Sequence, residues 1–122
     1  MSSDIISYTD LIRAVGDLIV RVDVLSTEFD PGVPKRLILD DIRDDLDVFQ
    51  RKLVRAYFDT TTPQIKSKVD SLSNINSEIK KTISDLDKFT KTLEQLVKFI
   101  EVGQELVKLL PVPLSLRSAL LV

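Results

Sequence analysis

The stretch that decides the fold runs from Pro63 to Leu110 and reads PQIKSKVDSLSNINSEIKKTISDLDKFTKTLEQLVKFIEVGQELVKLL. Its large aliphatic residues recur at every seventh position, and the column consists of Ile65, Leu72, Ile79, Leu86, Leu93, Ile100 and Val107. A seven-residue repeat keeps one stripe of a helix facing its neighbour, so such a column is typical of a coiled-coil seam. The pattern therefore predicts one long helix over residues 63–110.

The companion positions of this repeat alternate between apolar and polar side chains. They are Val69, Asn76, Ile83, Thr90, Val97 and Gln104. Polar residues inside a seam commonly fix register or partner number at some loss of stability. A break near residues 73–77 is the alternative, because Ser and Asn side chains there compete for backbone hydrogen bonds. The apolar column continues through this stretch and favours a continuous helix.

Two shorter helices are predicted before this stretch, because apolar residues recur there at helical spacing. The first covers about 4–29, with a broad apolar face opposite a ladder of alternating charges. The segment 30–34, DPGVP, predicts a turn, since Pro disfavours helix in the residue before it and Gly permits a sharp reversal. The second helix covers about 34–58, and its apolar face comprises Leu39, Ile42, Leu46, Phe49, Leu53 and Ala56. A turn with Thr62 as N-cap and Pro63 at the first helical position follows.

These elements predict an all-α fold: an antiparallel three-helix bundle or helical hairpin with a long C-terminal coiled-coil-like helix. We expect a single helical domain over 1–110 and an apolar C-terminal tail over 111–122. The tail carries one charge and six large aliphatic side chains. Packing of the tail on the bundle is expected, and a short amphipathic foot for a membrane or a partner groove is the alternative.

The lengths of the three predicted helices do not match. At about 1.5 Å per residue the first two are each on the order of 38 Å long, and the third approaches roughly 70 Å. Folding the second helix back on the third would place the acidic run 40–45 opposite Lys80 and Lys81, and the basic run 51–55 opposite Asp70. The end of the long helix would then have no cover from its own chain, and an exposed apolar patch of that size marks an interface. The candidate interface residues are Phe89, Leu93, Leu96, Val97, Phe99, Ile100 and Val107.

Catalysis has few residues to use in this chain. It contains no His and no Cys, which removes the commonest general base, the thiolate nucleophile and the usual zinc ligands. Neither of the common phosphate-binding glycine motifs occurs. The run 40–47, DDIRDDLD, offers five carboxylates that could hold magnesium. Acidic residues are also favoured in the first half of a helix, so we interpret the run as a solvated or salt-bridged face. The prediction is no enzyme, no cofactor and no metal site.

The charge balance and the hydropathy pattern bear on partners and location. Seventeen basic and nineteen acidic residues give a net charge of -2, so no overall basic field favours nucleic acid. No run of about eighteen uncharged apolar residues occurs, and the N-terminal residues lack the basic start of a secretory signal. We therefore expect a soluble, cytoplasmic protein whose main partner is neither nucleic acid nor a membrane.

The expected function is that of a non-enzymatic helical interaction module of scaffold, adaptor or inhibitor type. It would act through coiled-coil-like self-association, with a homodimer as the first expectation, or by docking a helical protein partner. Two alternatives remain open at this point: a membrane-active amphipathic helical protein, and a carboxylate-based metal-dependent enzyme.

Overall fold

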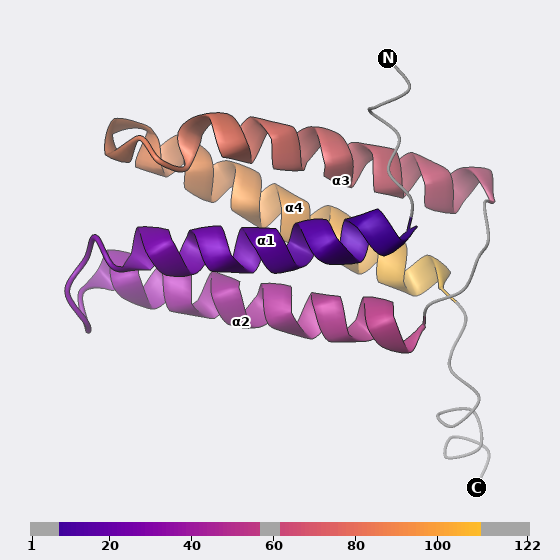
Figure 1. Cartoon of the computed structure of the whole chain (residues 1–122), viewed down its shortest axis with the longest axis horizontal. Coiled ribbons are helices and arrows are strands. Elements are labelled where there is room, and N and C mark those ends of the chain that lie inside the picture. Colours follow the sequence, from indigo (N-terminus) through magenta and orange to yellow (C-terminus); the bar gives the residue numbers. More distant parts are fainter. Residues whose placement is uncertain (1–7, 57–61, 111–122) are drawn as a thin grey trace, which may run out of the picture.

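The structure is a computed structural model that describes residues 8–56 and 62–110. In these residues the elements are four α-helices and a short 3₁₀ turn, and no strand is present (Figure 1). The elements are α1 (Tyr8–Ser26), α2 (Pro34–Arg55), α3 (Pro63–Thr82), η2 (Leu86–Lys88) and α4 (Phe89–Leu109). The predicted all-α helical bundle is confirmed.

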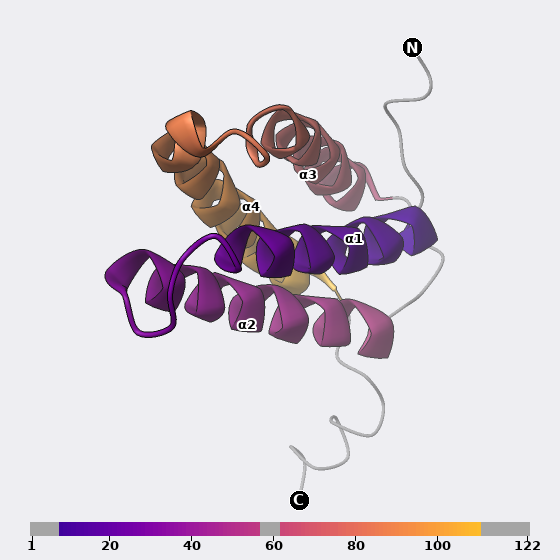
Figure 2. The ribbon, with the colours of Figure 1, turned by 60° about the vertical axis from the view of Figure 1, so that its left-hand side comes forward.

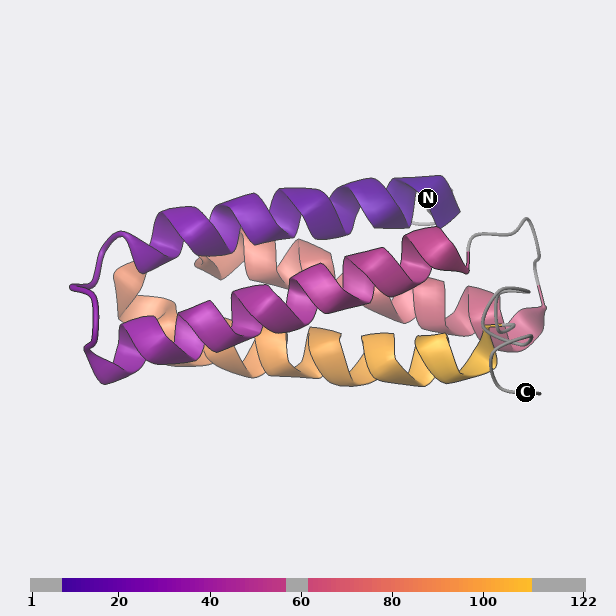
Figure 3. The ribbon, with the colours of Figure 1, turned by 90° about the horizontal axis from the view of Figure 1, so that it is seen from below.

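The four helices form two antiparallel hairpins that pack against each other. Helices α1 and α2 pack extensively together, as do α3 and α4. The hairpins meet mainly through α2 and α4, and less closely through α1 and α3. Figure 2 shows the α3–α4 hairpin lying over the α1–α2 hairpin, and Figure 3 shows α2 beside α4 on the lower side of the bundle. The chain direction in Figure 1 makes α1 parallel to α3 and α2 parallel to α4.

The core is built from the apolar stripe of each helix. In α1 and α2 the predicted apolar faces are confirmed, because six apolar residues of α1 and five of α2 are buried. They are Leu11, Val15, Leu18, Ile19, Val22 and Leu25 on α1, and Leu39, Ile42, Leu46, Phe49 and Leu53 on α2. At about 25 cal/mol per Å² of apolar surface removed from water, these stripes supply the main drive for hairpin formation.

The ends of the first two helices lie close to their predicted positions. Helix α1 ends at Ser26, three residues before the predicted end, and a turn with Gly32 at φ 88° leads into α2 at Pro34. Gly is suited to this positive φ because it has no Cβ to clash. The Thr62 hydroxyl accepts a hydrogen bond from the Ile65 N–H at 3.3 Å, so the predicted N-cap is confirmed. The predicted starts and ends at residues 4 and 58 lie outside the described residues, as does the tail 111–122.

The prediction of one continuous helix over 63–110 is wrong. Helix α3 ends at Thr82, and the chain reverses through residues 83–88 before α4 begins. The alternative break at 73–77 is also wrong, because those residues lie within α3. Leu86, a member of the heptad column, lies in the reversal and is 48% exposed.

Hydrogen bonds at the reversal explain why the helix stops there. The Asp85 carboxylate accepts from the Asp87 N–H at 3.0 Å, and the Lys88 N–H donates to the Asp85 carbonyl at 2.9 Å. Short polar side chains favour such local bonds over helix continuation. Across the reversal, the buried Thr92 hydroxyl donates to the Thr82 hydroxyl at 2.8 Å, which links the two helices where they meet. The hydrogen bonds at Asp85 end α3, and the hydrogen bond between Thr92 and Thr82 holds α4 against it. Together they explain why α3 and α4 form a hairpin.

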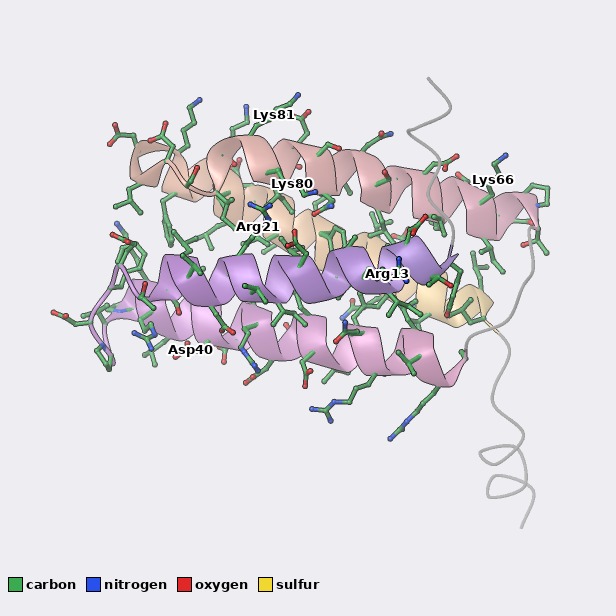
Figure 4. The ribbon with its side chains drawn as sticks, viewed as in Figure 1. Arg13, Arg21, Asp40, Lys66, Lys80 and Lys81 are labelled. Carbon is green, nitrogen blue, oxygen red and sulfur yellow. The ribbon has the colours of Figure 1, made fainter. Side chains whose placement is uncertain are left out.

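The ion pairs that join helices differ from the predicted set. Helices α2 and α3 do not pack extensively, and Figure 4 shows Asp40 on α2 far from Lys80 and Lys81 on α3. The predicted pairings between acidic α2 and basic α3, and between basic α2 and Asp70, are therefore wrong. Their premise was that the second helix folds back on the third. The hairpins instead carry Arg43–Asp23 at 3.0 Å between α2 and α1, and Lys68–Glu105 at 2.5 Å between α3 and α4.

Candidate functional site

The residues predicted as an interface do not lie together on one free surface. Helix α4 folds back onto α3 and α2, so Phe89, Leu96 and Phe99 are buried in the core of their own chain. Leu93, Ile100 and Val107 are half-buried against that core. Val97 is 46% exposed. The reasoning behind the prediction, that this helix has no cover from its own chain, is wrong for the three core residues.

An apolar groove instead lies between α1 and the α3–α4 reversal. Leu25 and Ile83 are buried at its base, and three exposed aliphatic residues flank it: Val20, Val24 and Leu86, with exposed fractions of 59%, 61% and 48%. Arg21, Glu28 and Ser84 complete the lining, and the volume is about 360 Å³. We call these eight residues the α1 groove.

The local geometry explains why this groove is apolar and open. Val20 and Val24 are four residues apart, so their side chains are neighbours on one face of α1. That face is not the buried stripe of Leu11, Val15 and Val22. The packing of α1 on α3 is the least extensive of the helix contacts described above, and α3 ends beside the groove. The two valines therefore have no covering helix among the described residues.

Folding does not account for valine at these two exposed positions. Val loses side-chain freedom in a helix and is a weaker helix former than Ala or Lys. An exposed Val also buries little apolar surface. Single exposed apolar residues are ordinary, but here three of them flank one concave surface, which makes the α1 groove the candidate binding site.

The end of α1 beside the groove is anchored by aromatic and cationic contacts. The rings of Phe29 and Phe89 meet edge to face at a centroid distance of 5.2 Å. The Lys35 ammonium lies 5.6 and 5.2 Å from these two ring centroids, and Arg36 donates to the Phe29 carbonyl at 3.0 Å. These contacts tie the α1–α2 turn to the start of α4. The α1 groove thus lies beside a part of the bundle that these contacts hold in place.

The charged rim of the α1 groove has opposite signs at its two ends. Arg21 lies on the side of α1 that faces α3 (Figure 4), and its Nε donates to the Asp17 carboxylate at 2.8 Å. Among the described residues the Nη groups of Arg21 have no hydrogen-bond partner, and neither has the Glu28 carboxylate. Both groups are available to an approaching molecule.

A second, more polar depression of about 310 Å³ lies between α2 and α4. Phe49, Ile100 and Val107 line it with the exposed Val48, and the polar residues around them are Asp45, Lys52, Gln104 and Lys108. Two of the predicted interface residues, Ile100 and Val107, therefore border a surface depression. Three ammonium or carboxylate groups around it leave a smaller apolar surface than that of the α1 groove.

The acidic run 40–47 lies along the outer side of α2 and is partly neutralised by arginines. Asp40 pairs with Arg36 at 3.4 Å, Asp44 lies 3.9 Å from Arg43, and Asp47 pairs with Arg51. Within residues 8–56 and 62–110, His, Cys, Asp and Glu side chains nowhere gather in a group of three that could hold a metal ion. This arrangement supports the interpretation of the run as a salt-bridged helix face.

Two further observations describe the electrostatics and the helix surfaces. The hydrogen bond and charge of Lys68 lower the pKa of the Glu105 carboxyl below its ordinary value of 4.5. In the part of the chain that the structure describes, every helix is too short or too polar to cross a lipid bilayer. Neither feature adds a chemically reactive group to the α1 groove.

The sequence interpretation missed Val20, Val24 and Leu86 as surface residues. Val20 and Val24 interrupt the charged side of α1 next to Arg21, and this signal was present in the sequence. Leu86 could not be recognised because it was assigned to a helical seam.

Comparisons with protein-family models, with curated proteins and with solved structures gave no match for this chain.

Proposed function

We propose that this protein is a non-enzymatic helical interaction module, of scaffold, adaptor or inhibitor type, that docks a helix in the α1 groove. The observation that carries the proposal is the exposure of Val20, Val24 and Leu86 around a groove with Leu25 and Ile83 at its base. The proposed mode of action is the one predicted from the sequence, coiled-coil-like self-association or partner-helix docking. The proposed binding surface lies on α1, whereas the sequence prediction placed it on the helix that is now α4.

The shape of the site supports a helical ligand. Helix-in-groove recognition uses apolar side chains at spacings of three and four residues that enter a hydrophobic depression. Val20 and Val24 form such a ridge beside the depression, so a docked helix would have ridges and grooves to engage. The charges of Arg21 and Glu28 at the rim would fix its direction.

The chemistry of the chain supports a binding role over a catalytic one. The sequence has no His or Cys, and the lining of the α1 groove has one carboxylate and one hydroxyl, Glu28 and Ser84. A nucleophile needs an adjacent base to be activated. The groove offers apolar contact and two charges, which suit recognition.

A binding experiment with a probe helix tests the proposal. Because the chain has no Cys, Ser84→Cys introduces a single site for an environment-sensitive fluorophore at the rim. A synthetic amphipathic helix of about twenty residues, built from Leu, Glu and Lys, is then titrated into the labelled protein. Saturable binding with a blue-shifted emission is expected, because docking removes water from the groove.

Two matched variants decide whether the signal comes from the groove. Val24→Glu should abolish the binding, whereas Val54→Glu, at a 56% exposed valine on α2 outside the groove, should leave it unchanged. Absence of saturable binding, or equal loss in both variants, contradicts the proposal. Circular dichroism of both variants checks that the helices remain folded.

A further inference from the structure

We infer that the α1 groove binds the α1 groove of a second copy of this chain, with the two α1 helices antiparallel about a two-fold axis near Val24. The inference rests on the proposed function and names its partner. It follows from the arrangement of charge and apolar surface within the groove itself, because a two-fold interface must be complementary to itself.

The charges meet this requirement in one orientation only. Arg21 lies on α1, and Glu28 lies seven residues later in the turn that continues the helix end, where the Glu28 N–H donates to the Leu25 carbonyl at 3.1 Å. The two residues are therefore on the order of 10 Å apart along the direction of α1, with Val24 near the midpoint between them. A two-fold axis between Val24 and Leu25 brings Arg21 of each copy opposite Glu28 of the other, so both pairs form at once. Parallel helices would place each charge against its like, which is repulsive.

Among residues 8–56 and 62–110, the hydrogen-bonding groups needed for these pairs have no other partner. Arg21 uses its Nε to hold Asp17 at 2.8 Å, and its two Nη groups can still donate to a second carboxylate. Within the described residues the Glu28 carboxylate makes no ion pair. The bond to Asp17 also orients the guanidinium, so less side-chain freedom is lost when a second carboxylate arrives.

The apolar residues meet the same requirement. Each copy offers both a ridge, Val20 and Val24, and a depression walled by Leu86 and based on Leu25 and Ile83. Ridges that pack into grooves are the ordinary basis of helix pairing. A patch that carries both shapes can pack against its own copy, and Val24 lies where the two copies meet at the axis.

The balanced charge of the rim favours a second copy over a strongly charged partner helix. One cation and one anion flank the valines, and the whole chain has a net charge of only -2, so neither a highly basic nor a highly acidic helix is selected. Exposed ion pairs contribute little affinity, so they set orientation while the apolar contact sets strength.

Sedimentation equilibrium of the full chain over a concentration series tests the inference. The mass should rise from 13.8 kDa toward twice that value with increasing concentration. Val24→Glu should remain monomeric, and Val54→Glu should dimerise like the wild type. Arg21→Glu should raise the dimer Kd by roughly tenfold, since two attractive pairs become repulsive. Adding Glu28→Arg to that variant should restore the wild-type Kd, and Arg13→Glu, with the same change of net charge away from the groove, should leave it unaltered.

A disulfide experiment locates the axis directly. Val24→Cys provides the only thiol in the chain, and oxidised glutathione should convert it to a covalent dimer because two Cα atoms near the axis can approach within disulfide range. Val54→Cys is the matched control and should form no disulfide-linked dimer, because Val54 lies outside the groove. A chain that stays monomeric at all concentrations and forms no disulfide overturns the inference, as does a dimer that Val24→Glu leaves intact. If the probe helix still binds in either case, only the choice of partner has failed and the proposed function stands.

Discussion

The contact between Gly103 on α4 and Phe49 on α2 predicts how closely the two hairpins must approach. A Cβ added at Gly103 would lie 2.9, 3.0 and 3.1 Å from three atoms of the Phe49 ring, Cζ, Cε2 and Cε1. Real Cβ atoms essentially never come within 3.0 Å of another atom, so the Phe49 ring, which packs edge to face on Phe99 at 6.1 Å, would have to move. Gly103→Ala should therefore push α4 away from α2.

The magnitude follows from two opposing effects. Overpacking a core by a methyl group costs typically about 1–3 kcal/mol. Replacing Gly by Ala inside a helix contributes about 1 kcal/mol in favour of folding. Because three ring atoms are compressed at once, we expect Gly103→Ala to lower the free energy of unfolding by about 1–2 kcal/mol. Urea denaturation followed by circular dichroism measures this directly, and a fall in Tm of roughly 5 °C should accompany it.

Gly16 on α1 is the matched control for this prediction. A Cβ there would meet only the Nε2 of Gln50 at 2.9 Å, the end of a flexible side chain that donates to the Ile12 carbonyl at 3.2 Å. The gain in helix propensity and the loss of that hydrogen bond are each about 1 kcal/mol, so Gly16→Ala should be close to neutral. If Gly103→Ala is as stable as Gly16→Ala, or if Phe49→Leu fails to relieve its effect in the double variant, the close approach of α2 and α4 is refuted.

Three further predictions concern polar groups. Asn76 is buried and its Oδ1 has no partner within the described residues, so Asn76→Leu should raise the free energy of unfolding by about 1 kcal/mol in urea; a marked loss would show that the amide has a partner. Thr92→Val should lower the free energy of unfolding by about 1 kcal/mol, because it removes the hydroxyl that donates to Thr82. In a double-mutant cycle, Thr82→Val should lower the free energy of unfolding less when Thr92→Val is already present; strict additivity would show that the hydroxyls do not interact. Lys68 lowers the pKa of Glu105 in the folded state, so the pair stabilises the fold at pH values above the ordinary pKa of 4.5, and this stability is lost as the pH falls through the folded pKa. NMR titration should show that Lys68→Met raises the Glu105 pKa, and an unchanged pKa would contradict the pairing.

The first hairpin could be predicted from sequence because each of its signals acts locally. Its apolar stripes recur at helical spacing, and the turn carries Gly32 at a positive φ. The capping of α3 by Thr62 is likewise a local interaction between a side chain and a backbone three residues away. Such features depend little on the rest of the chain, so a sequence pattern is enough to place them.

The reversal at 83–88 was missed because a seven-residue column shows that residues share a face, not that the helix is unbroken. In α3 the buried stripe follows Ile65, Val69 and Leu72, as the column requires. In α4 the buried stripe has shifted by one position, and comprises Phe89, Thr92, Leu96, Phe99, Gly103 and Leu106. The residues of the original column in α4 are only half-buried. The shift, marked by two phenylalanines beside the column, was the available signal.

The α1 groove could not be predicted from local pattern. Its two sides, around Val24 and Leu86, are about sixty residues apart in the chain and come together only when the hairpins dock. The exposed valines alone could equally have faced a neighbouring helix of the same chain. Their role depends on the relative placement of α1 and α3, which no periodicity encodes.

The division of the bundle into two hairpins has a consequence for the order in which the molecule folds. Contacts within each hairpin join helices that are adjacent in the chain, so forming them loses little chain entropy. The α2–α4 contact joins residues that lie far apart in the chain, such as Phe49 and Gly103, and therefore loses more. We expect the hairpins to form early and their docking to complete the native state. Native-state hydrogen exchange should then reveal two units, the α1–α2 hairpin and the α3–α4 hairpin, that open separately. The two hairpins should come apart first at the contact that Gly103 makes with Phe49.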